Sequence, residues 1–178
     1  TQNDSPETFD KVILASHADQ SLALLADADA QEKNLLSPFQ YQRNLATLHT
    51  DASVMPKTKL AWSSWNYRID QKPDSAVSPS TIYWMNSLQG VSDRENYFVS
   101  INGEDKINPT KILKRIEYHH PLFNLDAIRA QEQLPELNRR ANNPIYFCGS
   151  YFKYGFHEDA FTSALNLCRD LTGEKIWN

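Results

Sequence analysis

The chain has 178 residues, of which 40% are hydrophobic and 22% are charged, and its formal net charge is −4. This length suffices for one domain with a proper core, or for part of a larger protein. An acidic balance without a basic run excludes an electrostatic surface for nucleic acid.

The first residues of the chain and its two cysteines indicate the cellular compartment of the protein. The polar start has no initiator methionine, which predicts a fragment or a processed product. No apolar stretch reaches the roughly eighteen residues of a transmembrane helix, and no secretory signal opens the chain. Cys148 and Cys168 match no zinc or redox spacing, so we expect two buried, reduced thiols. These features predict a cytoplasmic protein without a transmembrane segment.

The N-terminal region predicts a strand followed by two helical segments. The apolar run Lys11–Ala15 predicts a short buried strand, and Ser21–Leu25 is helical in residue type and period. A second helical segment over Gln31–Leu36 ends at Ser37-Pro38, because the residue before a proline disfavours helix. Residues 1–36 are therefore one predicted strand–helix piece.

The middle of the chain, residues 37–124, predicts an antiparallel sheet of four to five strands joined by short polar links. Asn102-Gly103 is its strongest tight-turn signal. Two prolines predict a loop over residues 70–80. The predicted strands are Tyr41–His49, Leu60–Tyr67, Thr81–Leu88, Asn96–Ile101 and a strand beginning at Ile112.

The remaining residues, 125–178, predict a helix, a strand and a final helix that Gly173 closes. The predicted elements are a helix over Leu125–Gln133, extending to Arg140 with a break near Pro135, a strand over Pro144–Cys148 and a helix over Phe156–Leu171. The whole layout predicts an α+β fold. Its antiparallel or mixed sheet of about four to five strands is flanked by a strand–helix piece at each end of the chain.

Two of the five glycines, Gly149 and Gly155, flank an aromatic loop between the last strand and the last helix. A glycine at the end of a strand has no Cβ, so a ligand or another part of the chain can approach its backbone closely. The helix then begins with His157, Glu158 and Asp159, and its free N–H groups and positive dipole end favour an electron-rich partner. The alternative is structural: the two acids would complement the helix dipole, and Gly155 would open the turn.

This order of strand, small residue–glycine, aromatic loop, glycine and acidic helix start resembles the C-terminal flavin-contacting segment of FAD-dependent amine oxidase-like oxidoreductases. The segment Phe9–His17 is similar to the strand that re-enters the FAD domain in that family. The resemblance therefore implies that the strand–helix pieces at the two ends of the chain belong to an incomplete FAD-binding domain. The middle of the chain resembles a bacterial branch described as predicted NAD/FAD-binding proteins. The residues that carry this second likeness are Leu48–Asp51, Met55-Pro56, Ala61-Trp62, Ser64–Tyr67, Tyr83–Asn86, Leu88-Gln89, Tyr118–Pro121 and Gly155–Asp159.

The resemblance implies that the last helix points its N-terminus at the pyrimidine edge of the isoalloxazine ring, where reduced flavin carries negative charge. The FAD contacts that it implies are Gly149, Ser150, Gly155, Phe156, His157, Glu158, Asp159 and Ala160. In the family a substrate-domain sheet faces the flavin. The implied lining of a pocket for a small apolar or amine-like substrate is Trp62, Trp65 and Tyr83, whose alternative role is to form a core.

The chain departs from the family pattern in two places. Cys148-Gly149-Ser150 replaces the usual small residue–glycine–acid, so a hydroxyl stands where a carboxylate would contact the ribityl chain. No Gly-x-Gly-x-x-Gly occurs, so the part that binds the FAD diphosphate is absent. The expected partner is therefore an N-terminal dinucleotide-binding part of the same protein. Cys148 and His157 are conceivable points of covalent flavin attachment.

These observations lead to three hypotheses. The first is the C-terminal part of a flavoprotein oxidoreductase in which a hydride equivalent passes from substrate to flavin, this fragment alone being inactive. The second is a non-catalytic ligand-binding or interaction module that keeps the aromatic pocket. The third is isomerase or desaturase chemistry on a lipid-like substrate with the same flavin scaffold. Catalytic residues and substrate stay unassigned, because amine oxidase-like describes an architecture.

Other polar residues give weaker signals. The five histidines include no pair at helical i, i+4 spacing, and no carboxylate completes a known pattern, so we expect no metal site. His49 and Asp51 predict either a hydrogen-bonded pair beside the aromatic cluster or an exposed pair in a loop. No Gly-x-Ser-x-Gly motif occurs, so the sequence does not indicate a nucleophilic serine.

Overall fold

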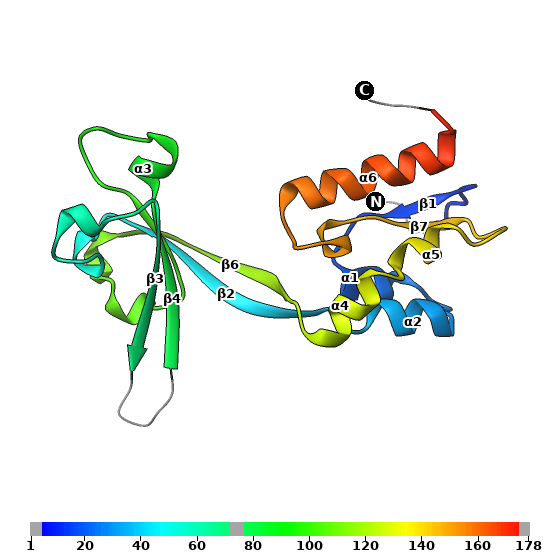
Figure 1. The fold of residues 1–178 in the computed structure, drawn as a ribbon, viewed down its shortest axis with the longest axis horizontal. Helices are drawn as coiled ribbons and strands as arrows, with labels where there is room; N and C mark the ends of the chain where they lie inside the picture. The colour runs from blue at the N-terminus through cyan, green and yellow to red at the C-terminus, as the bar shows by residue number, and fades with distance from the viewer. Residues whose placement is uncertain (1–4, 72–76, 175–178) are drawn as a thin grey trace. The chain divides into compact units, whose positions relative to one another are not determined.

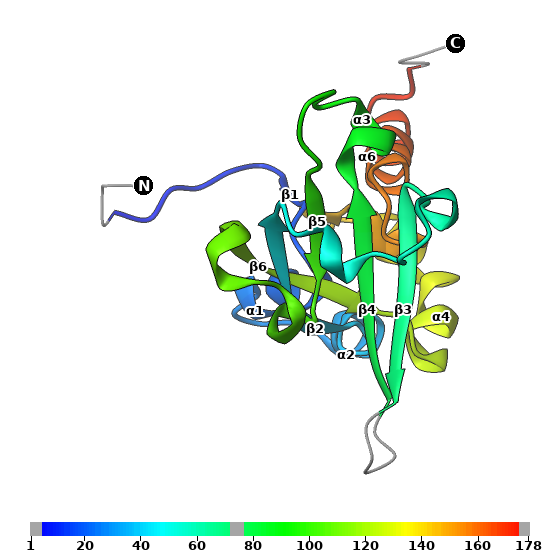
Figure 2. The same ribbon diagram turned by 90° about the vertical axis from the view of Figure 1, so that its left-hand side faces the viewer.

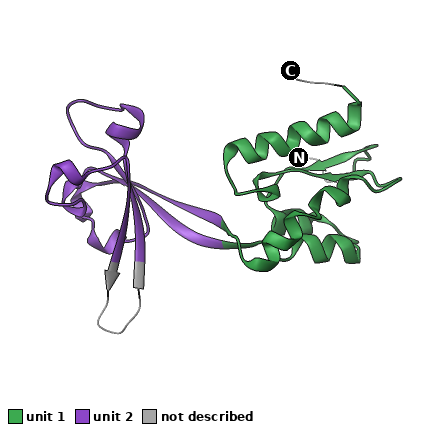
Figure 3. Cartoon of the chain, viewed as in Figure 1, with its two compact units in different colours: residues 1–41, 121–178 green, residues 42–120 purple. Residues whose placement is uncertain are grey.

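The computed structural model describes residues 5–71 and 77–174, and the fold of these residues is α+β, as the sequence predicts. They form a five-stranded antiparallel sheet, a two-stranded parallel sheet and six α-helices (Figure 1). The chain divides into two compact units (Figure 3). Unit 1 comprises residues 1–41 and 121–178, and unit 2 comprises residues 42–120, so unit 2 is an insertion in the sequence of unit 1.

Unit 1 is built around two short parallel strands from opposite ends of the chain. β1 (Val12–Leu14) pairs with β7 (Ile145–Phe147) in register from the first residue to the last. Because the strands are parallel, both carboxyl ends lie at one edge of the pair. The loops that begin there lead to α1 and to α6.

Helices lie on both sides of this strand pair, with α6 opposite the other four (Figure 1). Their bounds are α1 (Ala18–Leu24), α2 (Ala30–Leu36), α4 (Leu125–Gln131), α5 (Leu134–Asn138) and α6 (His157–Thr172). The core of unit 1 lies on the side of the four shorter helices and contains Ala18, Leu35, Leu36, Phe39, Ala127, Ala130, Leu134, Leu137, Phe147 and Tyr151.

Helix ends in unit 1 follow the sequence signals. α2 stops at Ser37, before proline. The predicted break near Pro135 separates α4 from α5, and the proline lies in the first turn of α5, where its missing N–H costs nothing. Gly173 ends α6 in the left-handed conformation, with φ of 69°.

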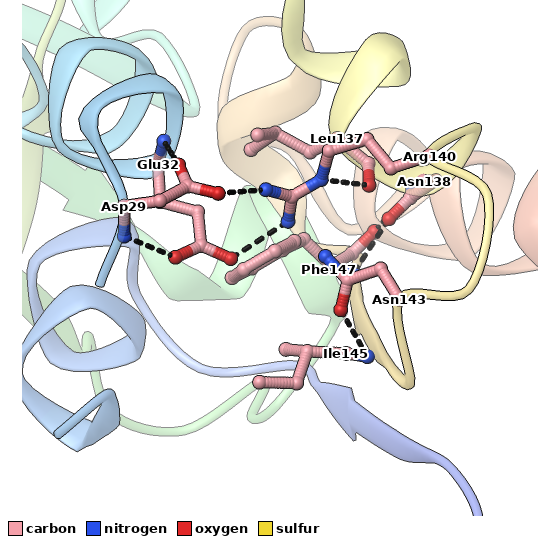
Figure 4. A network of polar contacts seen from close by, with 8 residues as sticks. All are labelled: Asp29, Glu32, Leu137, Asn138, Arg140, Asn143, Ile145 and Phe147. Atoms are coloured by element: carbon pink, nitrogen blue, oxygen red, sulfur yellow. Dashed lines mark hydrogen bonds and ion pairs between the residues drawn. The ribbon is translucent and has the colours of Figure 1, made fainter. Parts of the chain in front are cut away.

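Arg140 joins the start of α2 to the end of α5 (Figure 4). Its Nη1 lies 2.5 Å from Asp29 Oδ2, its Nη2 lies 2.7 Å from Glu32 Oε1, and its Nε donates to the carbonyl of Leu137 at 3.1 Å. The side chains of Arg140 and Glu32 are 18% and 6% exposed, so water screens this pair weakly. Asp29 and Glu32 also cap α2 reciprocally.

The two outer edges of the β1–β7 pair differ. Asn138 covers the edge of β7, because its side chain both donates to and accepts from the backbone of Phe147, at 2.8 and 2.7 Å (Figure 4). The N–H of Val12 and the C=O of Leu14 bond toward β7, so the backbone groups of Ile13 point to the other edge. The prediction of a buried strand is wrong in its burial, because Ile13 is 46% exposed. In the described residues, β1 has a strand neighbour on one side only.

Unit 2 is an antiparallel sheet with strand order β3-β4-β5-β2-β6 (Figure 2). Its strands are β2 (Gln40–His49), β3 (Trp65–Gln71), β4 (Val77–Trp84), β5 (Phe98–Ile101) and β6 (Ile112–Leu122). A second core lies on one face of this sheet. It contains Val54, Met55, Ile82, Phe98 and Ile107, with Trp62, Trp84 and Ile112 packed against it.

The predicted strand over Leu60–Tyr67 begins too early. A 3-10 turn occupies Lys59–Ala61. The side chain of Asn66 then accepts from the N–H of Ser63 and donates to its carbonyl, which holds the chain in a turn. β3 therefore begins at Trp65.

The predicted strand over Thr81–Leu88 ends too late, because β4 stops at Trp84 and α3 (Met85–Gln89) follows. The Asn86 side chain donates to the carbonyls of Ser92 and Glu95 and accepts from the N–H of Tyr97, so it holds the chain in a reversal. Gly90 ends α3 with φ of 62°.

The predicted loop over 70–80 is also too long, since β3 reaches Gln71 and β4 begins at Val77. Of the two prolines that suggested it, Pro79 pairs with Ile69 within the sheet. Pro73 lies outside the described residues.

His49 and Asp51 are both buried in unit 2, so the expectation of an exposed loop pair is wrong. His49 Nε2 lies 2.8 Å from Ser100 Oγ, and its Nδ1 accepts the N–H of Asp51 at 3.1 Å. The ring is thus held neutral, with Nδ1 as the acceptor. Burial lowers the pKa of His49, and the nearby Asp51 carboxylate opposes this only in part.

The Asp51 carboxylate fixes the loops on either side of it. It accepts the N–H groups of Ser53 and Asn108, and Lys111 Nζ lies 3.6 Å away. Burial alone would raise the pKa of Asp51. These donors and the ammonium outweigh burial and lower the pKa to about 2.

We expect the stability of unit 2 to fall as the pH drops below 6.5, the ordinary pKa of histidine. Because the folded pKa of His49 is lowered, the unfolded chain binds a proton that the folded chain does not. The His49 contribution is complete above pH 6.5 and is lost below it, with a limiting slope of about 1.4 kcal/mol per pH unit. Urea unfolding across this pH range should show the loss, which His49→Gln should remove and the exposed-site control His157→Gln should keep. A slope unchanged by His49→Gln would contradict the assignment.

We expect Arg140→Met to lower the free energy of unfolding by about 2 kcal/mol, because it leaves the shielded Glu32 carboxylate without its cationic partner. The matched control is Arg139→Met, which removes the neighbouring exposed pair with Glu136. That change should cost less than about 0.5 kcal/mol. Equal losses for the two variants in urea unfolding would show that the Arg140 network contributes no more than a surface pair.

Candidate functional site

The candidate site lies at the carboxyl ends of β1 and β7 in unit 1. In open α/β sheets, ligands bind outside this edge. The structure brings the two exits together: the carbonyl oxygen of Ser16 lies 3.5 Å from the position that a Cβ on Gly149 would take. The segment 149–160, which holds every residue expected to contact a flavin, begins here.

Gly149 is required by the fold itself. A Cβ at this position would lie 2.6 Å from Cε1 of Tyr151, so the ring fills the space that a side chain would need. The N–H of Gly149 donates to Ser163 Oγ at 2.8 Å, and this hydroxyl donates in turn to the carbonyl of Ala160 at 2.8 Å. The group that packs closely against the backbone of Gly149 is therefore the ring of Tyr151, and the Gly149 N–H is already bonded to Ser163.

The aromatic loop between the two glycines is held from within and from α4. The carbonyl of Ser150 accepts the N–H groups of both Lys153 and Gly155, each at 3.1 Å. The side chain of Gln131 donates to the carbonyls of Tyr151 and Lys153. Gly155 has φ of 91°, in the region that favours glycine. These bonds fix where α6 begins.

Asp159 acts as a cap in the first turn of α6. Its Oδ2 accepts the N–H groups of Tyr154 and Phe156, at 3.1 and 3.0 Å. Asp159 therefore has a structural role at the start of α6, as the structural alternative for the acidic residues proposed. The N–H of Ala160 is also used, since it donates to the carbonyl of Phe156 at 3.1 Å.

The remaining groups at the start of α6 face solvent. The side chains of His157 and Glu158 are exposed, and their N–H groups have no acceptor among the described residues. Phe156 is 68% exposed, and Tyr154 and Phe161 are exposed beside it. The start of a 16-residue helix is thus open, and exposed aromatic residues precede and follow it in the chain.

The exit of β1 is a second, half-buried part of the site. Ser16 Oγ lies 2.9 Å from the Oγ of the fully buried Ser21. His17 stacks on Tyr41 with ring centroids 4.3 Å apart, and the Tyr41 hydroxyl accepts the N–H of Ala18 at 2.9 Å. Burial raises the pKa of Tyr41 to about 12, so this phenol stays protonated.

Sequence reasoning missed several residues that position the site: Ser16, Tyr41, Gln131 and Ser163. Each is an ordinary polar residue in an amphipathic segment. Only Ser163 carried a signal, because it lies where the buried side of the last helix would otherwise be apolar.

The expected substrate-pocket residues do not come together in unit 2. Trp62 packs on Trp84 and Phe98 at the second core, with ring centroids 5.2 and 5.8 Å apart. Trp65 and Tyr83 are direct partners across β3 and β4, so they share a face of the sheet. Ile82, which neighbours Tyr83 in β4, belongs to the core, so Trp65 and Tyr83 lie on the opposite face from it.

That opposite face is open and apolar. Trp65 is 53% exposed, and Tyr67 and Ile69, which alternate with it along β3, are exposed as well. The register Tyr83↔Val99 and Leu48↔Val99 continues this face across the sheet. A cleft of about 360 Å³ lies there, lined by Leu48, Met85, Val91, Ser92, Tyr97 and Val99. The sequence did not indicate this cleft.

Of the two conceivable attachment residues, Cys148 lacks the environment of an activated nucleophile. Cys148 is buried, and burial raises the pKa of its thiol. Both cysteines are free thiols, Cys148 buried and Cys168 half-buried. Within residues 5–71 and 77–174, no group of three or more His, Cys, Asp or Glu side chains could hold a metal ion. In the same residues, no helix has both the length and the apolar character needed to cross a bilayer.

These residues fit one edge of a flavin better than the rest of FAD. Two free N–H groups at a helix start, with exposed aromatic residues nearby in the chain, suit a flat electron-rich group. No backbone cradle for a diphosphate exists at Gly149, because Ser163 takes its N–H. The site therefore forms at most one wall of an FAD pocket.

We expect Gly149→Ala to lower the free energy of unfolding by about 2 to 3 kcal/mol, because the new methyl group overlaps the ring of Tyr151. Gly90→Ala is the control, since that glycine is left-handed but has nothing within 4 Å of the added Cβ. It should cost about 1 kcal/mol. Equal costs in urea unfolding would show that the Tyr151 ring moves aside and does not fix Gly149.

Comparison with known proteins does not assign the chain to a family. No family model matches it, and no curated protein matches it.

Proposed function

We propose that this chain is part of an FAD-dependent oxidoreductase of amine oxidase-like type, to which it contributes a substrate-domain sheet and the helix start at the flavin. The observation that carries the proposal is the parallel pairing of β1 with β7. It brings Ser16 beside Gly149, at the edge where α/β sheets bind ligands, and the open start of α6 follows. The N–H groups of His157 and Glu158 are the donors assigned to the flavin edge.

The topology of the chain supports the same proposal. An antiparallel sheet of five strands is inserted between β1 and β7, as expected for a substrate domain that interrupts an FAD domain. Two parallel strands alone make a marginal sheet, and parallel sheets are usually covered on both faces. The open edge of β1, with its exposed Ile13, therefore suits a further strand from a dinucleotide-binding part of the same protein.

The open face of the unit 2 sheet is the surface assigned to substrate. Trp65 and Tyr83 lie on it, together with the apolar cleft between Leu48 and Val99. Trp62 has a core role instead. A surface with these side chains favours an apolar or aromatic group over a charged one.

The flavin, when bound, supplies the hydride-accepting chemistry, and the residues of this chain bind and orient. Asp159 and Gln131 hold the loop that sets the position of α6, and Ser163 fixes the strand exit beneath it. Positive charge at the helix start favours negative charge on the adjacent ring edge. We propose a cytoplasmic location for the enzyme.

The proposal is tested by producing the protein together with the coding sequence upstream of Thr1. We expect this protein to purify with the visible absorbance of bound flavin and the 178-residue chain to purify without it. One wall of a site cannot offset the ordering and desolvation costs of binding. A colourless longer protein that takes up no added FAD would overturn the proposal, and a ligand retained by the short chain would favour the binding-module hypothesis.

We expect Glu158→Gln to raise the midpoint potential of the flavin in the longer protein by roughly 10 to 20 mV, the two-electron equivalent of about 0.5 to 1 kcal/mol. The change removes a negative charge beside the ring edge that becomes negative on reduction. Asp170→Asn is the control, because it removes an exposed acid at the other end of the same helix. Equal shifts in the two variants would place the flavin away from the start of α6.

A further inference from the structure

The outer edge of β6 is a long exposed strand edge in unit 2. β6 has 11 residues and is the last strand in the order of its sheet. Residues 113–120 are exposed, and they include the apolar side chains of Leu113, Ile116 and Tyr118. Such an edge offers unpaired N–H and C=O groups to another strand unless a short length, a proline or a charge blocks the approach.

The charges on β6 are arranged as opposites around Ile116. Arg115 precedes Ile116 and Glu117 follows it. In an antiparallel pair of two identical strands with a two-fold axis at Ile116, Arg115 of each copy lies directly opposite Glu117 of the other. Opposite charges at directly facing positions stabilise strand pairing, and like charges weaken it.

The same axis also accommodates the next residues along the strand. Lys114 of each copy lies opposite Tyr118 of the other, where an ammonium group meets an aromatic ring. Leu113 lies opposite His119 in the same register. The edge charges that would repel a foreign strand therefore match a second copy.

Neighbouring registers are disfavoured by the same charges. A two-fold axis perpendicular to the sheet keeps each side chain on its own face. Because directly facing residues share a face, the axis must place one residue opposite its own copy and cannot place it opposite the next residue. An axis at Arg115 would place two guanidinium groups opposite each other, and an axis at Glu117 would place two carboxylates opposite each other. The charge pattern thus favours the axis at Ile116 over these two registers.

We propose that two copies of this chain associate through antiparallel pairing of their β6 strands, centred on Ile116. The two five-stranded sheets then form one continuous sheet. Within one chain, Arg115 lies 3.4 Å from Glu104, and Glu117 lies 2.5 Å from Arg43. All four side chains are largely exposed, so these contacts are weak and do not hold the charges away from a partner. The proposal is independent of the flavin function.

The test is sedimentation of the 178-residue chain over concentrations from about 1 to about 200 µM, where association by mass action becomes visible. We expect a monomer–dimer equilibrium. Arg115→Glu should raise the dissociation constant by roughly tenfold or more, because two attractive cross-strand pairs become repulsive. The double variant Arg115→Glu with Glu117→Arg should restore dimerisation, since it exchanges the partners and keeps the complementarity.

The matched control is Arg129→Glu, an equal charge reversal at an exposed position of α4. It should leave the dissociation constant unchanged, and circular dichroism should show all variants folded. A wild-type chain that stays monomeric at every concentration overturns the proposal. A dimer that Arg115→Glu does not weaken, or that a folded double variant does not restore, overturns the register.

Discussion

The parallel pairing of β1 with β7 is the contact on which unit 1 depends. It joins the two ends of the chain across the whole inserted unit 2, so its loop-closure cost must be met by burial on the neighbouring helices. Phe147 supplies part of that burial in the core, and Asn138 satisfies its backbone at the outer edge. Without this pairing, Ser16 and Gly149 would not meet, and the loop to α6 would have no fixed origin.

Structural and functional explanations of the glycine motif are compatible. Gly149 is bare because Tyr151 occupies the space beside it, and Asp159 is acidic because it caps the loop before α6. Both features then leave the first N–H groups of the helix unpaired and exposed. The polar groups therefore fix the position of the helix start while leaving it open, which is the arrangement that the proposed flavin contact requires.

Four surfaces of the described residues expose apolar side chains or unpaired backbone groups. They are the edge of β1, the aromatic start of α6, the open face around Trp65 and the edge of β6. Exposed apolar surfaces of this kind mark interaction sites. By contrast, three of the buried polar side chains of unit 2, those of His49, Asp51 and Ser100, bond to one another or to nearby backbone.

The sequence by itself determined the elements whose signals are local. The α+β class, the last helix with its Gly173 end, the stop of α2 at Ser37 and the break at Pro135 all follow from period, propensity and capping, which act within a few residues. The same rules failed where one asparagine side chain bonded to nearby backbone groups and held the chain in a turn. Asn66 and Asn86 ended or delayed strands through bonds that residue type does not reveal.

Only the tertiary structure decided which side chains share a site. It placed Tyr151 against Gly149, Ser163 beneath the strand exit, and Trp62 on the other face of the sheet from Trp65 and Tyr83. It also showed that His49 and Asp51 are buried, and that β1 has an unpaired edge in the described residues. The physical reason is that burial, strand register and hydrogen-bond partners depend on segments far apart in the chain, and their meeting is set by packing.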